Sequence, residues 1–198
     1  MRKNPAKANW NWRLGVLLLV VIAVGIFQRY RAVRESSQDA VILAAARKYQ
    51  VEPALIKAVV WRESRFDPSA RGRKGEVGLM QLRQAAAEEW AHSEHWMSIG
   101  PDDLLHPDVN TLAGTWYLRK LIARYQQTDN PLPYALADYN AGRTHVLDWA
   151  KGETATNSAA FVEKIGFPST RDYVKAILKR RERYRGRFPS VANPASTP

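Results

Sequence analysis

The chain has 198 residues, which suits one compact domain with a short appendage, and it contains no cysteine, which excludes disulfides, thiolate zinc sites and a cysteine nucleophile. The formal charge of +11 is distributed unevenly: residues 1–34 carry +7, residues 35–170 carry −2 and residues 171–198 carry +6. The nearly neutral middle argues against a nucleic-acid-binding domain. The basic ends favour a membrane surface or an anionic polymer as the partner.

The first predicted element is an apolar helix near the N-terminus. Residues 14–27, LGVLLLVVIAVGIF, are all apolar or glycine, and flanking aromatic residues extend the stretch to residues 10–30, roughly 30 Å of helix. No small-residue cleavage site follows this run, so we interpret residues 1–34 as an uncleaved anchor that spans a membrane through residues 10–30. A cleaved signal segment is the alternative interpretation.

Helical periodicity dominates the rest of the chain, and no strand-like alternation extends over more than a few residues. Residues 67–78 are rich in glycine, proline and charge, which indicates a loop or a small hairpin near 71–79, and residues 92–107 are mostly connection. The expected fold is therefore mainly α over residues 35–187, followed by a disordered tail at 188–198. Helices are predicted over residues 36–50, 51–64, 79–91, 108–125, 131–142, 143–152 and 170–185.

Glu63 is the first candidate for chemistry. Ile56, Val60 and Glu63 are spaced by four and three residues, which places this carboxyl on the apolar face of its helix. A buried carboxyl must be paired or must keep its proton through a raised pKa, and a protonated carboxyl near neutral pH is what a general acid requires. Spacing alone leaves a structural ion pair or a helix-end contact open.

Two later segments carry residues suited to a ligand groove. In GEVGLMQL, residues 75–82, two glycines permit positive φ or close approach of a ligand, and Gln81 can hydrogen-bond an amide or a hydroxyl. In LADYNAG, residues 136–142, Tyr139 and Asn140 stand near a helix end. Taken singly, each of these residues is better explained by packing or capping.

The order of four motifs makes the pattern specific. RES-x-F-x-P, GLMQ, HPDVN-x-x-x-G-x-x-YL and YNAG follow one another between residues 62 and 142. Over residues 37–185 this sequence resembles the catalytic domain of the soluble-lytic-transglycosylase (SLT) family, which has a lysozyme-like fold. The resemblance implies cleavage of the MurNAc–GlcNAc β-1,4 bond of peptidoglycan with formation of a 1,6-anhydro end, in which Glu63 acts first as acid and then as base.

The resemblance also implies the remaining site residues, and it shows three departures. Gly72 stands where a serine is often found, Ser169 stands where a glutamate is common, and the proline that often follows GLMQ is absent. No metal or cofactor is expected, since the His-x-Glu-His run at 92–95 lacks a recognised ligand spacing. The substrate-binding residues implied are Ser64, Gly78, Met80, Gln81, Tyr139, Asn140 and Tyr173.

Two other functions stay open. Glu76 is the one nearby acid that could act as a second carboxylate, which would permit a hydrolytic, lysozyme-type muramidase, although we expect it to be a loop charge. A glycan-binding or envelope-assembly module without catalysis is the other alternative. In every case the expected location is the bacterial cell envelope, with an inner-membrane anchor and a periplasmic domain, or secretion if the N-terminal segment is cleaved.

Overall fold

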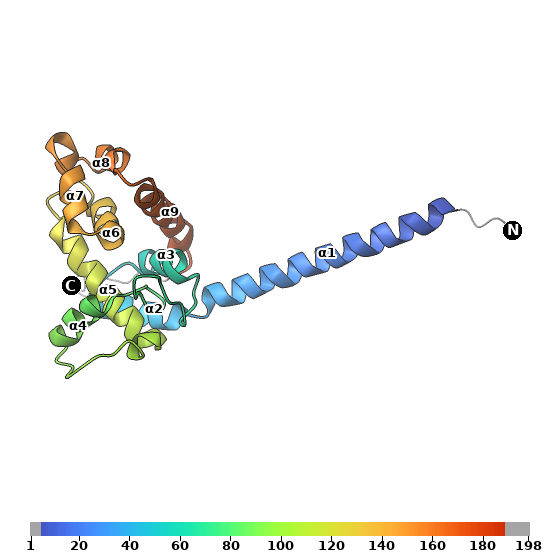
Figure 1. Cartoon of the computed structure of the whole chain (residues 1–198), viewed down its shortest axis with the longest axis horizontal. Helices are drawn as coiled ribbons and strands as arrows, with labels where there is room; N and C mark the ends of the chain where they lie inside the picture. The colour runs from blue at the N-terminus through green and yellow to red at the C-terminus, as the bar shows by residue number, and fades with distance from the viewer. Residues whose placement is uncertain (1–4, 189–198) are drawn as a thin grey trace, which may run out of the picture. The chain divides into compact units, whose positions relative to one another are not determined.

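The structure, a computed structural model, describes residues 5–188 (Figure 1). The chain divides into two units, Met1–Ser37 and Gln38–Pro198. The first unit contains α1 (Pro5–Ser36), which confirms the apolar N-terminal helix. In the part of the chain that the structure describes, one helix near the N-terminus is long and apolar enough to cross a membrane, by length and composition only.

The second unit is a bundle of helices without a sheet among its described residues, which confirms the mainly α fold. Two isolated antiparallel bridges, Arg71–Val77 and Val77–Leu82, form the small hairpin-like turn expected in this region. The elements are α2 (Asp39–Tyr49), α3 (Pro53–Ser64), α4 (Gln84–Ser93), the 3₁₀ turn η1 (Asp103–Leu105), α5 (Pro107–Arg124), α6 (Pro131–Ala141), α7 (Arg143–Trp149), the 3₁₀ turn η2 (Gly152–Ala155), α8 (Ser158–Lys164) and α9 (Pro168–Arg185).

The structure differs from the prediction most clearly at α4, at α8 and at the first residue of the tail. The helix expected over 79–91 begins only at Gln84, because Val77 and Leu82 exchange backbone hydrogen bonds of 2.9 and 3.0 Å and hold the intervening residues in a turn. The short helix α8 has no counterpart in the prediction; Asn157 caps it by accepting a hydrogen bond from Ala160 N. Of the predicted tail, Phe188 packs against the core, and residues 189–198 lie outside the described residues.

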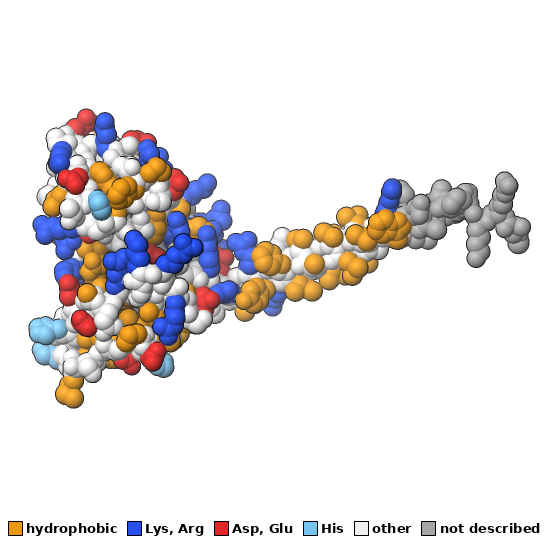
Figure 2. Space-filling view, in the orientation of Figure 1, with side chains coloured by type: hydrophobic (Ala, Val, Ile, Leu, Met, Phe, Trp, Pro, Cys, Tyr) orange, Lys and Arg blue, Asp and Glu red, His pale blue; other side chains and the backbone are white. Residues whose placement is uncertain are grey.

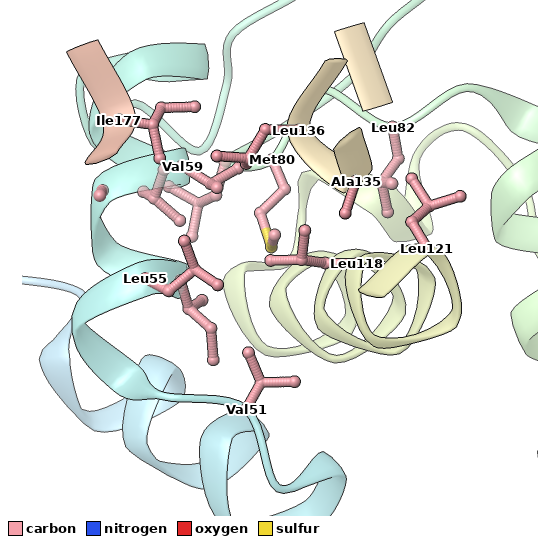
Figure 3. Close-up of a cluster of buried hydrophobic side chains, with 14 of the residues drawn as sticks. Val51, Leu55, Val59, Met80, Leu82, Leu118, Leu121, Ala135, Leu136 and Ile177 are labelled. Carbon is pink, nitrogen blue, oxygen red and sulfur yellow. The ribbon is translucent and has the colours of Figure 1, made fainter. Parts of the chain in front are cut away.

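Helix α3 lies at the centre of the core. Every residue from 53 to 60 is buried, so α3 has no solvent face in this stretch, whereas the sequence pattern predicted one apolar side. The reason is that α2 and α9 both pack against it. Figure 3 shows Leu55 and Val59 of α3 in one cluster with Met80, with Leu118 and with Ile177 of α9.

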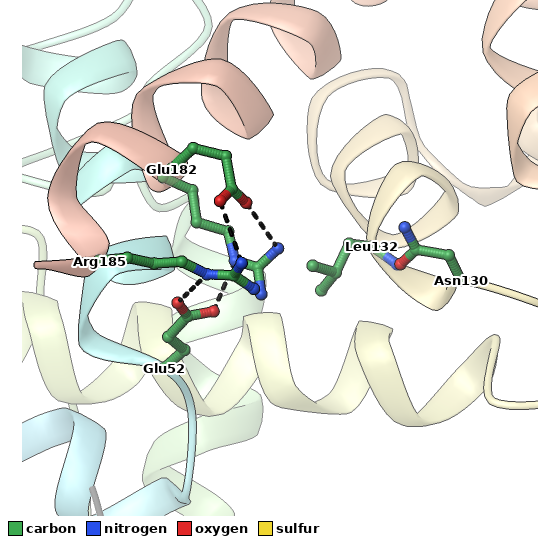
Figure 4. Close-up of polar contacts among 6 residues, drawn as sticks. Glu52, Asn130, Leu132, Glu182 and Arg185 are labelled. Atoms are coloured by element: carbon green, nitrogen blue, oxygen red, sulfur yellow. Dashed lines mark hydrogen bonds and ion pairs between the residues drawn. The ribbon is translucent and has the colours of Figure 1, made fainter. Parts of the chain in front are cut away.

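Ion pairs attach α9 to the start of α3. Glu52, which precedes α3, accepts hydrogen bonds from Arg181 Nε at 2.5 Å and Arg185 Nε at 3.1 Å, and Arg185 also pairs with Glu182 (Figure 4). At the same end of the unit, the buried Lys57 donates a hydrogen bond to Asp39 at 2.5 Å. Part of the basic run at 179–187 is therefore structural and holds α9 in position beside α3.

Candidate active site

Glu63 stands at the last turn of α3, where the chain changes direction sharply. Arg65 and Phe66 both adopt left-handed backbone conformations, with φ of 54° and 65°, and Phe66 is buried. Such conformations are unfavourable for side chains like these and persist only when packing enforces them. Here the guanidinium of Arg65 lies 3.9 Å from the ring centroid of Trp61, and Arg180 of α9 lies at the same distance from that ring.

The carboxyl of Glu63 is held by α9. The Tyr173 hydroxyl donates a hydrogen bond to Glu63 Oε1 at 2.5 Å, and the Arg62 guanidinium lies over the Tyr173 ring at 5.3 Å. Burial raises the pKa of Glu63 to about 7, although the hydrogen bond from Tyr173 and the positive charge of Arg62 act in the opposite direction. At neutral pH the carboxyl therefore exists in both protonation states, as an acid–base catalyst requires.

The turn before α4 is built around two left-handed residues. Gly78 has φ of +79°, and a Cβ at this position would collide with Leu104 O and with Asn110 Nδ2, so only glycine fits. Gln81 has φ of +48°, and its side-chain amide donates hydrogen bonds to Ala70 O at 3.0 Å and Gly78 O at 2.9 Å. The amide nitrogen of Gln81 thus stabilises the turn. Neither of these two hydrogen bonds uses the side-chain carbonyl oxygen.

Asn110, on α5, is the main residue that the sequence interpretation left without a role. It is fully buried; its Oδ1 accepts a hydrogen bond from Met80 N at 2.8 Å, and its Nδ2 donates to Val77 O and Leu104 O at 2.8 and 2.9 Å. It therefore satisfies three backbone groups of the turn. The sequence feature that could have identified Asn110 is the presence of a polar amide on the apolar stripe of its helix.

Tyr139 and Asn140, near the end of α6, join this turn to α9. The Tyr139 hydroxyl donates a hydrogen bond to Met80 O at 2.7 Å, and its ring meets Tyr117 edge-on at a centroid distance of 5.7 Å. Burial raises the pKa of Tyr139 well above its usual value, so this phenol stays protonated and remains a donor. Asn140 Oδ1 accepts a hydrogen bond from Thr170 Oγ1 at 2.8 Å.

These elements enclose a cleft of about 390 Å³ that brings together half of the predicted site residues. Glu63, Gln81, Tyr139 and Asn140 line it. Ser64, Gly78, Met80 and Tyr173 lie behind the wall instead: the Ser64 hydroxyl, for example, donates to Val60 O within its own helix. Glu76, which the sequence interpretation considered only as a possible second carboxylate, also lines the cleft. The sequence interpretation did not include the remaining lining residues, which are Leu82, Arg83, Ala86, Tyr117, Asp138, Ala141 and Gly142.

Glu76 is part of the cleft wall, although the sequence led us to expect a loop charge. Its Oε1 accepts hydrogen bonds from Arg83 Nη2 at 3.0 Å and Nε at 3.2 Å, and its Oε2 accepts one from Lys74 N at 3.0 Å. Partial burial acts to raise the pKa of Glu76, but the hydrogen bonds from Lys74 and Arg83 outweigh it and lower the pKa. The cleft lining thus includes Glu63, whose pKa lies near neutrality, and Glu76, which stays ionised; its third carboxyl, Asp138, is paired with Arg124 at 2.6 Å.

The His-x-Glu-His run and Ser169 have no place in this cleft. Glu94 accepts hydrogen bonds from Lys48 Nζ at 2.6 Å and from the Tyr49 hydroxyl at 2.8 Å, which makes it part of the packing between α2 and α4. Ser169 is exposed in the first turn of α9.

Comparisons with known proteins identify the family of this chain. The family model described as "Transglycosylase SLT domain" matches residues 40–162. The chain is 37% identical over 133 residues to the soluble lytic murein transglycosylase of Salmonella typhimurium, covering 65% of this chain and 20% of that protein. It is 38% identical over 107 residues to the membrane-bound lytic murein transglycosylase F of Desulfosudis oleivorans, covering 52% of this chain and 22% of that protein.

Solved structures give the same result for the fold. An inactive mutant of the lytic transglycosylase Slt of Pseudomonas aeruginosa matches with a TM-score of 0.68 at 26% identity, over 79% of this chain and 25% of that one. A complex of the 70-kDa soluble lytic transglycosylase with bulgecin A matches with a TM-score of 0.69 at 25% identity, over 95% of this chain and 30% of that one. The chain spans about a fifth of the length of the curated relatives that it matches. It belongs to the transglycosylase SLT domain family.

Proposed function

We propose that this chain is a peptidoglycan lytic transglycosylase that cleaves the β-1,4 bond between MurNAc and GlcNAc and leaves a 1,6-anhydro-MurNAc end. The observation that carries the proposal is Glu63: a partly buried carboxyl in the wall of a cleft, with a pKa of about 7 and a hydrogen bond from Tyr173. The names of the related proteins, which are lytic murein transglycosylases, support the same substrate.

One carboxyl is sufficient for this reaction. Glu63 gives its proton to the glycosidic oxygen, the bond from this oxygen to C1 of MurNAc breaks, and GlcNAc leaves with a free 4-hydroxyl. Glu63, now a carboxylate, takes the proton of the MurNAc C6 hydroxyl, and the C6 oxygen forms the new bond to C1. No water is consumed and Glu63 ends protonated, so a pKa near the working pH serves both steps.

The other site residues divide into substrate contacts and wall supports. Gln81 and Asn140 face the cleft and offer amide groups to the sugar's acetamido and hydroxyl groups, with the Tyr139 ring beside them. Tyr173 positions Glu63, and Gly78 and Met80 maintain the turn that carries Gln81. Ser64 supports the end of α3.

A hydrolytic muramidase is the second candidate function, and the position of Glu76 is the observation that favours it. Ordinary glycoside hydrolysis uses two carboxyl groups, one protonated and one ionised, and the cleft contains such a pair. The products separate the two reactions, because hydrolysis adds water to the cleaved end and the transglycosylase reaction does not.

The test is product analysis with the full chain in detergent or nanodiscs. Purified peptidoglycan sacculi are incubated with wild-type protein, with Glu63→Gln and with Glu163→Gln. Glu163→Gln is the matched control, because Glu163 is an exposed acid on α8 that is ion-paired with Lys175. We expect soluble anhydro-ended fragments from wild type and control and none from Glu63→Gln. Reducing ends would establish the muramidase instead, and binding of sacculi without release would support the non-catalytic module.

We further propose that the enzyme works in the bacterial envelope, anchored in the inner membrane by the segment within residues 1–34, with residues 35–187 as the periplasmic catalytic domain. The apolar helix α1 supports the anchor, and the relatives named membrane-bound support this type of location.

A further inference from the structure

Gly72 leaves a space that the side chain of Glu76 fills. A Cβ at Gly72 would collide with Glu76 Oε2 and would stand 2.9 Å from Glu76 Cβ and 3.0 Å from Gln81 Oε1. The backbone of Gly72 does not have the positive φ of Gly75 and Gly78, so its conformation does not itself call for glycine. Glycine at position 72 instead leaves the space that the Glu76 carboxylate occupies, and a side chain here would displace that carboxylate.

The Glu76 carboxylate is held in this position from both ends of its loop. Arg83 contacts Oε1 with two nitrogens, Lys74 N contacts Oε2, and the backbone oxygen of Glu76 accepts a hydrogen bond from Gly72 N at 2.7 Å. A charge-assisted, two-pronged contact with a guanidinium favours the ionised form and one orientation. Glu76 is thus a fixed anion in the cleft wall.

This anion and Glu63 share the cleft and interact. The charged or polar groups that act on Glu63 are Tyr173 from α9, Tyr139 from α6, Arg62 from its own helix and Glu76 from the loop. The two tyrosines stay protonated because burial raises the pKa of each well above its usual value. Arg62 favours loss of the proton from Glu63, and Glu76 opposes it.

We propose that Glu76, admitted by Gly72 and oriented by Arg83, is a second acidic group of the active site that holds the proton on Glu63 before cleavage and attracts the positive charge that develops on the sugar as the glycosidic bond breaks. Glu76 forms no bond and exchanges no proton. Its action on the sugar rests on the proposed function, whereas its action on Glu63 is independent of any substrate.

Two variants distinguish this role of Glu76 from a purely structural one. Its ion pair with Arg83 is at the surface, with the Arg83 side chain 60% exposed, and pairs of this kind contribute little to stability. Glu76→Gln should therefore fold, and it removes the charge while keeping the shape. Gly72→Ala keeps the charge but displaces it, because the new methyl group takes the place of the carboxylate. If the position of the Glu76 carboxylate determines its action, both variants should change the protonation of Glu63 in the same direction.

The experiment measures the protonation of Glu63 directly in the full chain. Glutamate is labelled at its carboxyl carbon, and the NMR signal that disappears in Glu63→Gln is followed with pH in wild type, Glu76→Gln and Gly72→Ala. We expect both variants to lower the proton affinity of Glu63 by roughly 3- to 10-fold, the size expected for a like charge in the same partly solvated cleft. Glu163→Gln, which also removes an ion-paired acid, should leave the midpoint unchanged.

The rate of glycan release provides the second measurement. In Glu76→Gln and Gly72→Ala the alkaline limb of the pH–rate profile should move to lower pH by the same factor, and the maximal rate should fall. An unchanged Glu63 midpoint in Glu76→Gln overturns the proposal, and a wild-type midpoint in Gly72→Ala overturns the part assigned to Gly72. If wild type releases no glycan, the proposed function fails, but a shifted midpoint still supports the interaction between the two acids.

Discussion

At the scale of the residue, the site places a cost on the fold. Glu63 is a carboxyl whose pKa is raised from an ordinary 4.5 to about 7, mainly by burial. Between these two values the folded chain binds a proton that the unfolded chain has released, so the free energy of unfolding falls as pH rises through this window. Below pH 4.5 both states are protonated and the cost is absent; above pH 7 it is present in full.

Glu63→Gln should therefore stabilise the protein at alkaline pH. The shift corresponds to about 3 kcal/mol in the free energy of unfolding above pH 7, and glutamine retains an oxygen that can accept the Tyr173 hydrogen bond. Urea unfolding at pH 8 should show the variant as more stable by up to this amount, and unfolding at pH 4 should show no difference.

Glu163→Gln is the matched control for this measurement. The ion pair with Lys175 lowers the pKa of Glu163, so removing its charge should give no gain in stability at pH 8. Equal unfolding free energies of wild type and Glu63→Gln at pH 8 would contradict the conclusion that ionised Glu63 destabilises the folded chain.

At the scale of the element, the sequence predicted the features that depend on residues close together in the chain, namely the positions of helices and their inward faces. Helical spacing located α3, α5, α6 and α9 to within a few residues, and it placed Glu63 on an inward face. The contact of Tyr173 with Glu63 joins residues 110 positions apart, and no local pattern contains it. The family resemblance supplied Tyr173 as a candidate, but without its partner.

The turn before α4 is a segment where the local sequence pattern gave the wrong structure. Its residues Leu79–Leu82 have an apolar, helix-like composition, and the prediction extended the helix through them. The left-handed Gly78 and Gln81 and the buried Asn110 on α5 hold this segment out of a helix. Side-chain hydrogen bonds from a distant element thus override local propensity, and this is where Gln81 obtains its position in the cleft.

The packing of α5 against this turn gives a prediction at the same scale. A Cβ at Gly114 would stand 2.5 Å from Met80 Sδ and 2.8 Å from Met80 Cβ, and the Met80 backbone is held by Asn110 and Tyr139. Helix propensity alone favours alanine over glycine by about 1 kcal/mol, while overpacking costs about 1–3 kcal/mol. We expect Gly114→Ala to lower the free energy of unfolding in urea.

Gly186→Ala is the control for Gly114→Ala, because nothing lies within 4 Å of a Cβ there and its φ of −76° suits alanine. It should leave stability unchanged. A more stable Gly114→Ala protein would show that propensity outweighs the contact with Met80 and that α5 can move away from the turn.

At the scale of the whole molecule, the two units have different surfaces. Hydrophobic side chains cover much of α1 (Figure 2), and residues such as Leu19 and Ile26 are 67% and 66% exposed. A continuous apolar surface of this length is unfavourable in water and fits the interior of a bilayer. The globular unit instead buries its apolar residues in a core of its own.

Two features could hold the protein at a membrane. One is insertion of the apolar helix α1, and the other is attraction of the basic ends of the chain to anionic lipids.

Extraction from bacterial membranes distinguishes these two ways. A protein held by charge is released by high salt, because salt screens the attraction, whereas a spanning helix resists both high salt and alkaline carbonate. We expect the full chain to stay in the membrane fraction under both treatments and to keep the mass of the complete sequence. Replacing Leu19 and Val20 by arginine should move it to the soluble fraction, since each arginine at the centre of a span costs about 2.5–3.5 kcal/mol of insertion free energy. Replacing the exposed Lys179 and Arg183 of α9 by glutamine tests the charges and should leave the protein in the membrane. A soluble protein that lacks the N-terminal residues would instead establish the cleaved signal segment.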